Sequence, residues 1–165
     1  MEAPAAFDLK GYGILLPRLM RWPGDSGFSV AMWIRLDSWP EHQTRGDTVD
    51  VAARGVGVPL PGEELLFRFR AVNGIGVELA VRSGGQLVSR VTGERGRVLS
   101  ELAGASGVGR IGVRRWHRVI ATYRSTFMGW MDSGAVWVDG LKVVEGPISY
   151  PKPNEARLQE SYIGG

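Results

Sequence analysis

The 165-residue sequence contains no cysteine, two histidines and only two asparagines, and each shortage removes a class of function. Without cysteine there are no disulfides and no thiolate metal ligands, which fits a reducing compartment. Neither asparagine lies in a glycosylation site, because Asn73 is followed by Gly-Ile and Asn154 by Glu-Ala. No apolar run approaches the roughly 18 residues of a membrane span, and the N-terminus lacks the apolar core of a signal peptide. We therefore expect a cytoplasmic protein.

The residue pairs on which hydrolases depend are also missing. Glycoside hydrolysis needs two carboxylates, but no Glu-x-Asp-x-x-Glu pattern occurs, and Asp47 and Asp50 stand three apart in a polar stretch. A serine or threonine nucleophile needs a histidine base. His42 lies in the same polar stretch, and His117 lies in a predicted strand, where a structural histidine is the expected interpretation. The acidic residues do not cluster as calcium requires. We predict no enzymatic activity, no catalytic residue, no cofactor and no metal ligand.

What the sequence does contain is 24 glycines and nine prolines, spread between short apolar runs in a chain that is 44% hydrophobic. This composition is typical of one domain made of many strands and turns. Three of the 20 basic residues are lysine, so 17 are arginine, and the net charge is +3. The arginines are dispersed along the chain, which disfavours a nucleic-acid partner. Their abundance fits either phosphate recognition or a GC-rich genome.

Alternation of apolar and polar residues predicts the strands. From Phe28 to Asp37 every even position is apolar, so one face of this strand should lie in a core. Leu65 to Val72 and Val77 to Arg82 alternate in the same way, with turn residues between them, and Ser83-Gly84-Gly85 then turns the chain into Gln86 to Val91. These stretches predict a meander of three strands. Its outward face carries three arginines, namely Arg68, Arg70 and Arg82.

The strongest turn signal is Asp139-Gly140, which is typical of a two-residue β-hairpin loop of type I′. Such a loop fixes the register, so Val138 should face Leu141 and Val136 should face Val143. Trp137 then falls opposite Lys142 on the other face. Its indole is either covered by the lysine stem or available to a ligand.

Two stretches follow no period. Residues 40–64 are polar and rich in glycine and proline, and residues 92–112 carry several glycines after a helical turn expected at Val98 to Ala103. We expect both to be long loops of one domain at 11–165, which follows a short N-terminal tail at 1–10.

The hairpin region resembles a known kind of domain. The stretch WHRVIATY, which begins at Trp116 and His117, and the stretch AVWVDG, which ends in Asp139 and Gly140, are similar to a hairpin of concanavalin A-like, laminin G-like jelly rolls.

The segment GYGILLPRLMRWPGDSGFSVAMWIRLD is more specific, because it is similar to the opening of the concanavalin A-like domain of BEACH-family proteins such as neurobeachin. It holds the pair Trp22 and Pro23 and the strand tryptophan Trp33. The stretch from Ser161 to Gly164 resembles the late Tyr-Ile-Gly strand of the same domain.

The resemblance implies an all-β, concanavalin A-like jelly-roll sandwich of two antiparallel sheets. It also implies truncation at the C-terminus, since the family domain continues past the Tyr-Ile-Gly strand. The function implied is a non-enzymatic interaction module of a BEACH-type scaffold in vesicle trafficking, lysosome biology or autophagy. Protein partners are expected, with glycan or lipid headgroup contacts as further options, and peripheral association with endomembranes only through the larger scaffold.

A free-standing carbohydrate-binding, lectin-like module is the alternative function, and a degenerate glycosidase is a third. Few amide side chains are available for sugar hydroxyls, which disfavours the lectin. Arginine and tryptophan are enriched at binding hot spots, so the interaction surface that we expect consists of Arg68, Arg70, Arg82 and Trp137.

Overall fold

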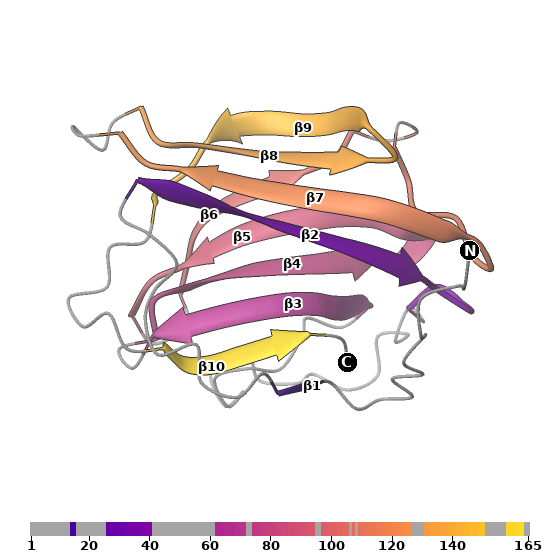
Figure 1. Ribbon diagram of the computed structural model, residues 1–165, viewed down its shortest axis with the longest axis horizontal. Coiled ribbons are helices and arrows are strands. Elements are labelled where there is room, and N and C mark those ends of the chain that lie inside the picture. Colours follow the sequence, from indigo (N-terminus) through magenta and orange to yellow (C-terminus); the bar gives the residue numbers. More distant parts are fainter. Residues whose placement is uncertain are drawn as a thin grey trace, which may run out of the picture.

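The computed structural model shows an all-β jelly-roll sandwich, in which two antiparallel sheets pack face to face (Figure 1). In the part of the chain that the structure describes, helical residues are found only in 3-10 conformation, at Ser83–Gly85 and at Glu94, and no helix is long and apolar enough to cross a membrane. The predicted fold class is confirmed. The described residues are 26–40, 62–71, 74–94, 97–105, 107, 109–126 and 131–150, with the strand backbone at 14–15 and 158–163.

The larger sheet has six strands in the order β1-β10-β3-β4-β5-β6. Its centre, β3 to β5, is the meander that the alternating sequence predicts. The bounds are β1 Ile14–Leu15, β10 Leu158–Ile163, β3 Glu63–Ala71, β4 Gly76–Arg82, β5 Gln86–Thr92 and β6 Val98–Ala103.

The smaller sheet has four strands in the order β2-β7-β8-β9. Figure 1 looks onto this sheet, with β4, β5 and β6 behind it. The bounds are β2 Gly27–Arg35, β7 Trp116–Arg124, β8 Ser133–Val138 and β9 Leu141–Pro147.

The core lies between the two sheets and is built from alternate positions of each strand. In β2 the even residues Phe28, Val30, Met32 and Ile34 pack against the buried cluster, and the odd residues from Ser29 to Arg35 are exposed. This arrangement confirms the period-two prediction for the strand. It also fixes which residues of the smaller sheet face outward.

An aromatic group with one polar link occupies the middle of the core. The ring of Phe28 stacks on Tyr123 with a centroid distance of 4.9 Å, and Phe67 meets Tyr123 edge-on at 6.4 Å. The Tyr123 hydroxyl is 2.9 Å from Ser89 Oγ, so this hydrogen bond joins β7 of one sheet to β5 of the other. Burial raises the pKa of the Tyr123 phenol far above its ordinary value, and the bond to Ser89 offsets only part of that effect.

The expected helical turn at Val98 to Ala103 is wrong, because this stretch is strand β6. It pairs with β5, and Gly104 N–H continues the pairing by donating to Leu87 O at 3.1 Å. The stretch Leu-Ser-Glu-Leu-Ala favours a helix in isolation, but the hydrogen bonds and side-chain pairs offered by β5 outweigh that weak local preference. The expected loop at 92–112 therefore contains a sheet strand.

The β8–β9 hairpin has the predicted turn but not the whole predicted register. Asp139 and Gly140 have φ values of 51° and 85°, as a type I′ turn requires. Val138 faces Leu141 and Trp137 faces Lys142 as expected, but Val136 faces Val144, because a bulge in β9 inserts one extra residue at Val143.

Several sequence predictions fall wholly or partly outside the described residues. The tail at 1–10, the pair Trp22 and Pro23, and residues 41–61 of the expected loop 40–64 all do so. The end of that loop is placed, and it is shorter than expected because β3 already begins at Glu63.

Candidate functional site

The outer face of the six-stranded sheet carries a set of charged residues, which we call the Arg–Glu face. Its members alternate with core residues along β3, β4, β5 and β6, and the strand register sets opposite charges beside each other. They are Glu63, Arg68, Arg70, Glu78, Arg82, Arg90 and Glu101.

At one end of this face two arginines and two glutamates form a closed set of ion pairs. Glu63 accepts hydrogen bonds of 2.7 Å from both Arg82 Nε and Arg90 Nη1. Glu101 accepts from Arg82 Nη2 at 2.9 Å and from Arg90 Nε at 2.8 Å. Burial by itself raises the pKa of the Glu101 carboxyl. The hydrogen bonds and charges of Arg90 and Arg82 lower it by more than burial raises it, so the pKa is below the ordinary value. The Glu101 carboxyl therefore stays charged between the two arginines.

At the other end two arginines share one carboxylate. Arg68 Nε donates to Glu78 Oε1 at 2.8 Å, and Arg70 Nη2 approaches the same oxygen at 3.4 Å. Arg68 and Arg70 are only 3% and 4% exposed. Charges buried to this extent persist only when paired, and both arginines are paired within the sheet by Glu78.

The expected interaction surface is thus not one exposed surface. Arg68 and Arg70 are buried, and Arg82 keeps about a third of its side chain exposed at 33%. Trp137 lies on β8, in the other sheet. Period-two alternation correctly predicts that the three arginines point away from the core, but it does not predict the carboxylates that pair with them.

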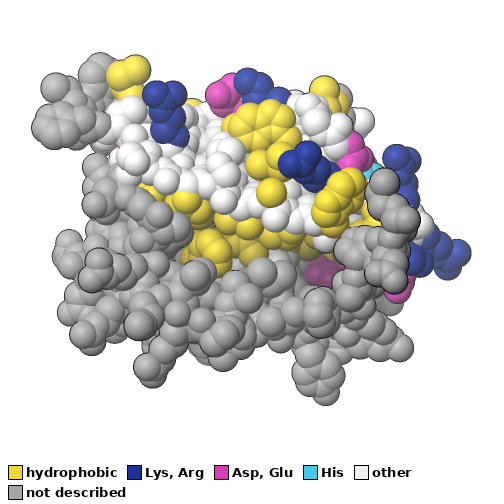
Figure 2. All heavy atoms as spheres, in the orientation of Figure 1, with side chains coloured by type: hydrophobic (Ala, Val, Ile, Leu, Met, Phe, Trp, Pro, Cys, Tyr) yellow, Lys and Arg dark blue, Asp and Glu magenta, His cyan; other side chains and the backbone are white. Residues whose placement is uncertain are grey.

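The outer face of the four-stranded sheet carries exposed tryptophans, and we call it the Trp face. In the register of β2 and β7, Trp33 faces Arg118 and Arg35 faces Trp116, while Trp137 on β8 faces Ile120. Figure 2 shows this side of the molecule, with hydrophobic side chains beside Arg or Lys. The Trp face consists of Trp33, Arg35, Trp116, Arg118, Ile120 and Trp137.

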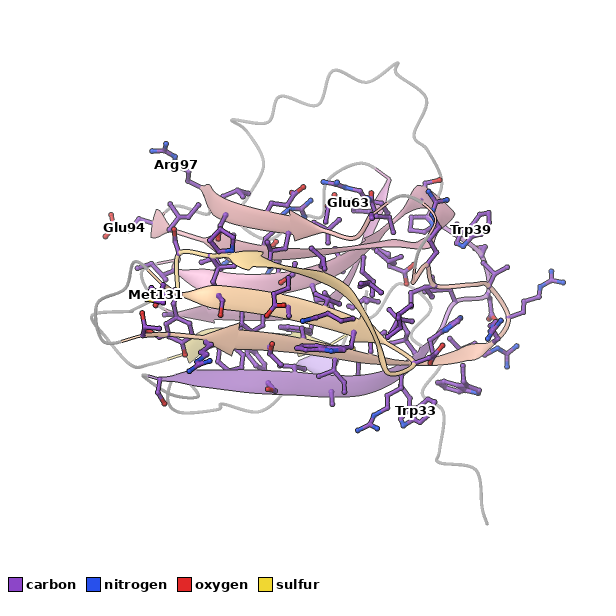
Figure 3. The ribbon with its side chains drawn as sticks, turned by 90° about the horizontal axis from the view of Figure 1, so that it is seen from above. Trp33, Trp39, Glu63, Glu94, Arg97 and Met131 are labelled. Carbon is purple, nitrogen blue, oxygen red and sulfur yellow. The ribbon has the colours of Figure 1, made fainter. Side chains whose placement is uncertain are left out.

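Two of the three tryptophans of this face are open to solvent. Trp33 is 61% exposed and Trp116 is 47% exposed, and Trp137 is half-buried. Figure 3 shows Trp33 on the outer side of the four-stranded sheet, with Glu63 on the opposite side of the sandwich. From the sequence, Trp33 and Trp116 are expected only as structural motif residues. The signal that both point outward is their position in the alternation: Trp33 has an odd number in β2, where the even residues face the core, and Trp116 has an even number in β7, where the odd residues are buried.

Arg118 lies at the centre of the Trp face. Trp33 is directly across from it, Trp116 is two residues along the same strand, and Trp137 is its diagonal neighbour on β8. Among the described residues the Arg118 guanidinium has no hydrogen bond or ion pair. Arg35, by contrast, lies 3.4 Å from the exposed carboxylate of Asp37.

A hydrogen-bonded chain holds the backbone of Arg118 in place. Gly112 N–H donates to His117 Nε2 at 2.9 Å, so the ring proton is on Nδ1, which donates to Asp139 Oδ2 at 2.7 Å. Asp139 Oδ1 accepts from Arg118 N–H at 2.9 Å. These bonds, that from Arg118 N–H first and that from His117 second, hold the pKa of the Asp139 carboxyl below its ordinary value. Both ring nitrogens of His117 are thus engaged in holding the hairpin against β7.

Metal binding finds no support in the described ranges. There, no group of three or more histidine, aspartate or glutamate side chains is arranged to hold an ion.

Comparison with known proteins gives information on the fold. No family model and no curated protein matches the chain. The endo-β-1,4-glucuronan lyase of the fungus Trichoderma reesei superposes with a TM-score of 0.51 at 15% identity, covering 86% of this chain and 56% of that one. The alginate lyase vAL-1 from Chlorella virus superposes with a TM-score of 0.52 at 9% identity, covering 86% and 62%. The chain therefore shares their sandwich fold and spans about three fifths of their length.

These matches correct the function expected from the sequence. The expectation of a non-enzymatic BEACH-type trafficking scaffold is wrong, because the two solved structures named above are polysaccharide lyases. The prediction that the chain is not an enzyme is overturned by the same finding. The alternative of a carbohydrate-binding module agrees better with these neighbours.

Proposed function

We propose that this sandwich is a carbohydrate-active domain that binds a polysaccharide chain across its Trp face. The observation that carries the proposal is that three tryptophans surround Arg118 on the outer face of the four-stranded sheet. The shared fold with two polysaccharide lyases supports the same class of ligand.

The physical basis is stacking of indole rings on sugar rings. A pyranose has an apolar face of C–H groups, and a tryptophan supplies a large, rigid surface for it at small entropic cost. Trp33 and Trp137 lie two strands apart, about 10 Å, and Trp116 lies about 13 Å along the strands from the level of Trp137. A set of contacts with this spread fits several units of a chain better than one sugar.

Cleavage of the bound chain is the second candidate function. It is favoured by one observation, that both similar solved structures are named as lyases. A lyase breaks a uronate chain by elimination, so one product carries a carbon–carbon double bond that absorbs in the ultraviolet.

Binding can be tested with a panel of soluble polysaccharides, both neutral and acidic, by isothermal titration calorimetry. We expect Trp33→Ala and Trp116→Ala each to weaken the Kd about tenfold, the order expected for a lost ring contact with its buried area. Trp39→Ala is the matched control. Trp39 is also exposed, at 46%, but lies off the Trp face, where its indole N–H donates to Ile111 O at 3.3 Å.

Absence of binding to every polysaccharide, or equal loss in the Trp39 variant, would overturn the binding proposal. Incubation of the same panel with the wild-type chain tests the second candidate. Growth of ultraviolet absorbance supports cleavage, and its absence on glucuronan and alginate excludes these substrates.

A further inference from the structure

We infer that the ligand of the Trp face is an acidic polysaccharide, whose carboxylate is bound by Arg118. This inference rests on the proposed function, since it specifies the ligand class for the same face.

The two outer faces use arginine in opposite ways. On the Arg–Glu face, the guanidinium of Arg90 is hydrogen-bonded to Glu63 and Glu101, which leaves its donors occupied and its charge neutralised. On the Trp face, Arg118 is exposed and has no carboxylate bound among the described side chains. An arginine of the second kind presents its planar donor fork to solvent, and that geometry matches a carboxylate.

The neighbours of Arg118 restrict the kind of anion. Three tryptophans surround it in the sheet lattice, so an anion bound there must bring an apolar surface on more than one side. A uronate unit has this combination, because its carboxylate projects from the edge of a ring whose faces carry C–H groups. A free phosphate or a simple peptide carboxylate fills only the guanidinium site.

The rigid placement of Arg118 favours binding further. Its backbone N–H is held by Asp139, and Asp139 is held in turn by the buried His117. Little backbone entropy is therefore lost when the side chain engages a ligand. Arg35, beside Trp116, adds a second cation on the same face, although Asp37 partly neutralises it.

The decisive experiment compares Arg118→Gln with Arg124→Gln. Both arginines are exposed on β7 and point to the same side, but they are six residues, or about 20 Å, apart. Titration calorimetry with alginate, glucuronan and a neutral β-glucan of matched length measures the Kd of each variant. Polyglutamate serves as an anionic chain without sugar rings.

We expect Arg118→Gln to weaken alginate or glucuronan binding about tenfold or more, the range for a hydrogen bond to a charged group, and Arg124→Gln to change it less than twofold. Wild-type binding should fall with added salt, and neutral glucan and polyglutamate should bind much more weakly.

Failure of this inference is distinguishable from failure of the proposed function. Equal affinity for neutral and acidic chains, lost in Trp33→Ala but retained in Arg118→Gln, would overturn acidic specificity and leave polysaccharide binding intact. Polyglutamate binding as tight as alginate binding would show a general polyanion site and also overturn the inference. No binding to any polysaccharide would overturn both.

Discussion

Two adjacent glutamates of β3 illustrate how much depends on which face a single residue occupies. Glu63 faces Arg82 of the neighbouring strand β4, and its side chain lies on the outer face of the sheet, where it also binds Arg90. Glu64 faces Val81, a core residue, so its side chain enters the space between the sheets. Burial raises the pKa of the Glu64 carboxyl above its ordinary value of 4.5.

Substitution of these two glutamates should have opposite effects on stability. At pH 7 the charged form of Glu64 opposes folding, because a raised folded-state pKa means that the folded chain binds the proton more tightly than the unfolded chain. We expect Glu64→Gln to raise the urea midpoint at pH 7. That gain should shrink as the pH falls through the folded-state pKa toward 4.5, where Glu64 of the wild type also becomes neutral.

The neighbouring change serves as the matched comparison. Glu63→Gln leaves the buried guanidinium of Arg90 partly uncompensated, which should lower the free energy of unfolding by about 3 to 5 kcal/mol. A Glu63→Gln variant as stable as wild type, or a Glu64→Gln variant that is destabilised at pH 7, would show that the two faces of β3 are assigned wrongly.

At the scale of single elements, the β8–β9 hairpin combines a predictable turn with an unpredictable bulge. The Asp-Gly pair identifies the turn because few residues adopt positive φ at both central positions. Nothing in the run Leu141 to Val144 distinguishes which valine is the extra residue, since both are apolar and β-branched. Packing determines the position of the bulge, because Val143 is buried in the core while Leu141 is 53% exposed.

The turn can be tested with one pair of glycine substitutions. Gly140 has a φ of 85°, and a Cβ there would meet nothing within 4 Å, so only backbone strain opposes a side chain. We expect Gly140→Ala to lower the free energy of unfolding by about 1 to 2 kcal/mol. Gly104→Ala is the control, because its Cβ would make ordinary contacts of 3.8 Å or more and its φ is not positive. Equal effects of the two changes on the urea midpoint would contradict the type I′ turn.

At the scale of the whole molecule, alternation in the sequence predicts strands and their core faces, and the resemblance to jelly-roll domains implies the sandwich, but neither predicts the partners of the outer faces. The meander from β3 to β5 follows directly from period two, whereas β6 is recognisable only through its pairing with β5. The burial of Arg68 depends on Glu78, which lies ten residues away on the next strand. The Trp face depends on the register between β2, β7 and β8, which brings together residues more than 80 positions apart.

Burial of the Tyr123 phenol should set the alkaline limit of the fold. Because burial raises the pKa of this phenol, its contribution to stability is complete below the ordinary tyrosine pKa of 10.0 and is lost as the pH rises toward the folded-state value. Tyr123→Phe should therefore lower the urea midpoint at pH 7, since Ser89 loses its hydrogen-bond partner. Above pH 10.0, however, the urea midpoint of this variant should fall less with pH than that of the wild type, because the variant has no phenol to ionise at this position.

The core thus carries its own optical reporter of sheet separation. We expect the tyrosinate absorbance of Tyr123, measured as the difference between the wild type and Tyr123→Phe because the chain has four tyrosines, to appear only when β5 and β7 separate. It should therefore rise together with the loss of far-ultraviolet circular dichroism. Ionisation of this residue ahead of unfolding would mean that solvent reaches the phenol while the sheets are still closed. If the two changes coincide, proton release from one side chain in the middle of the sandwich measures the opening of the whole molecule.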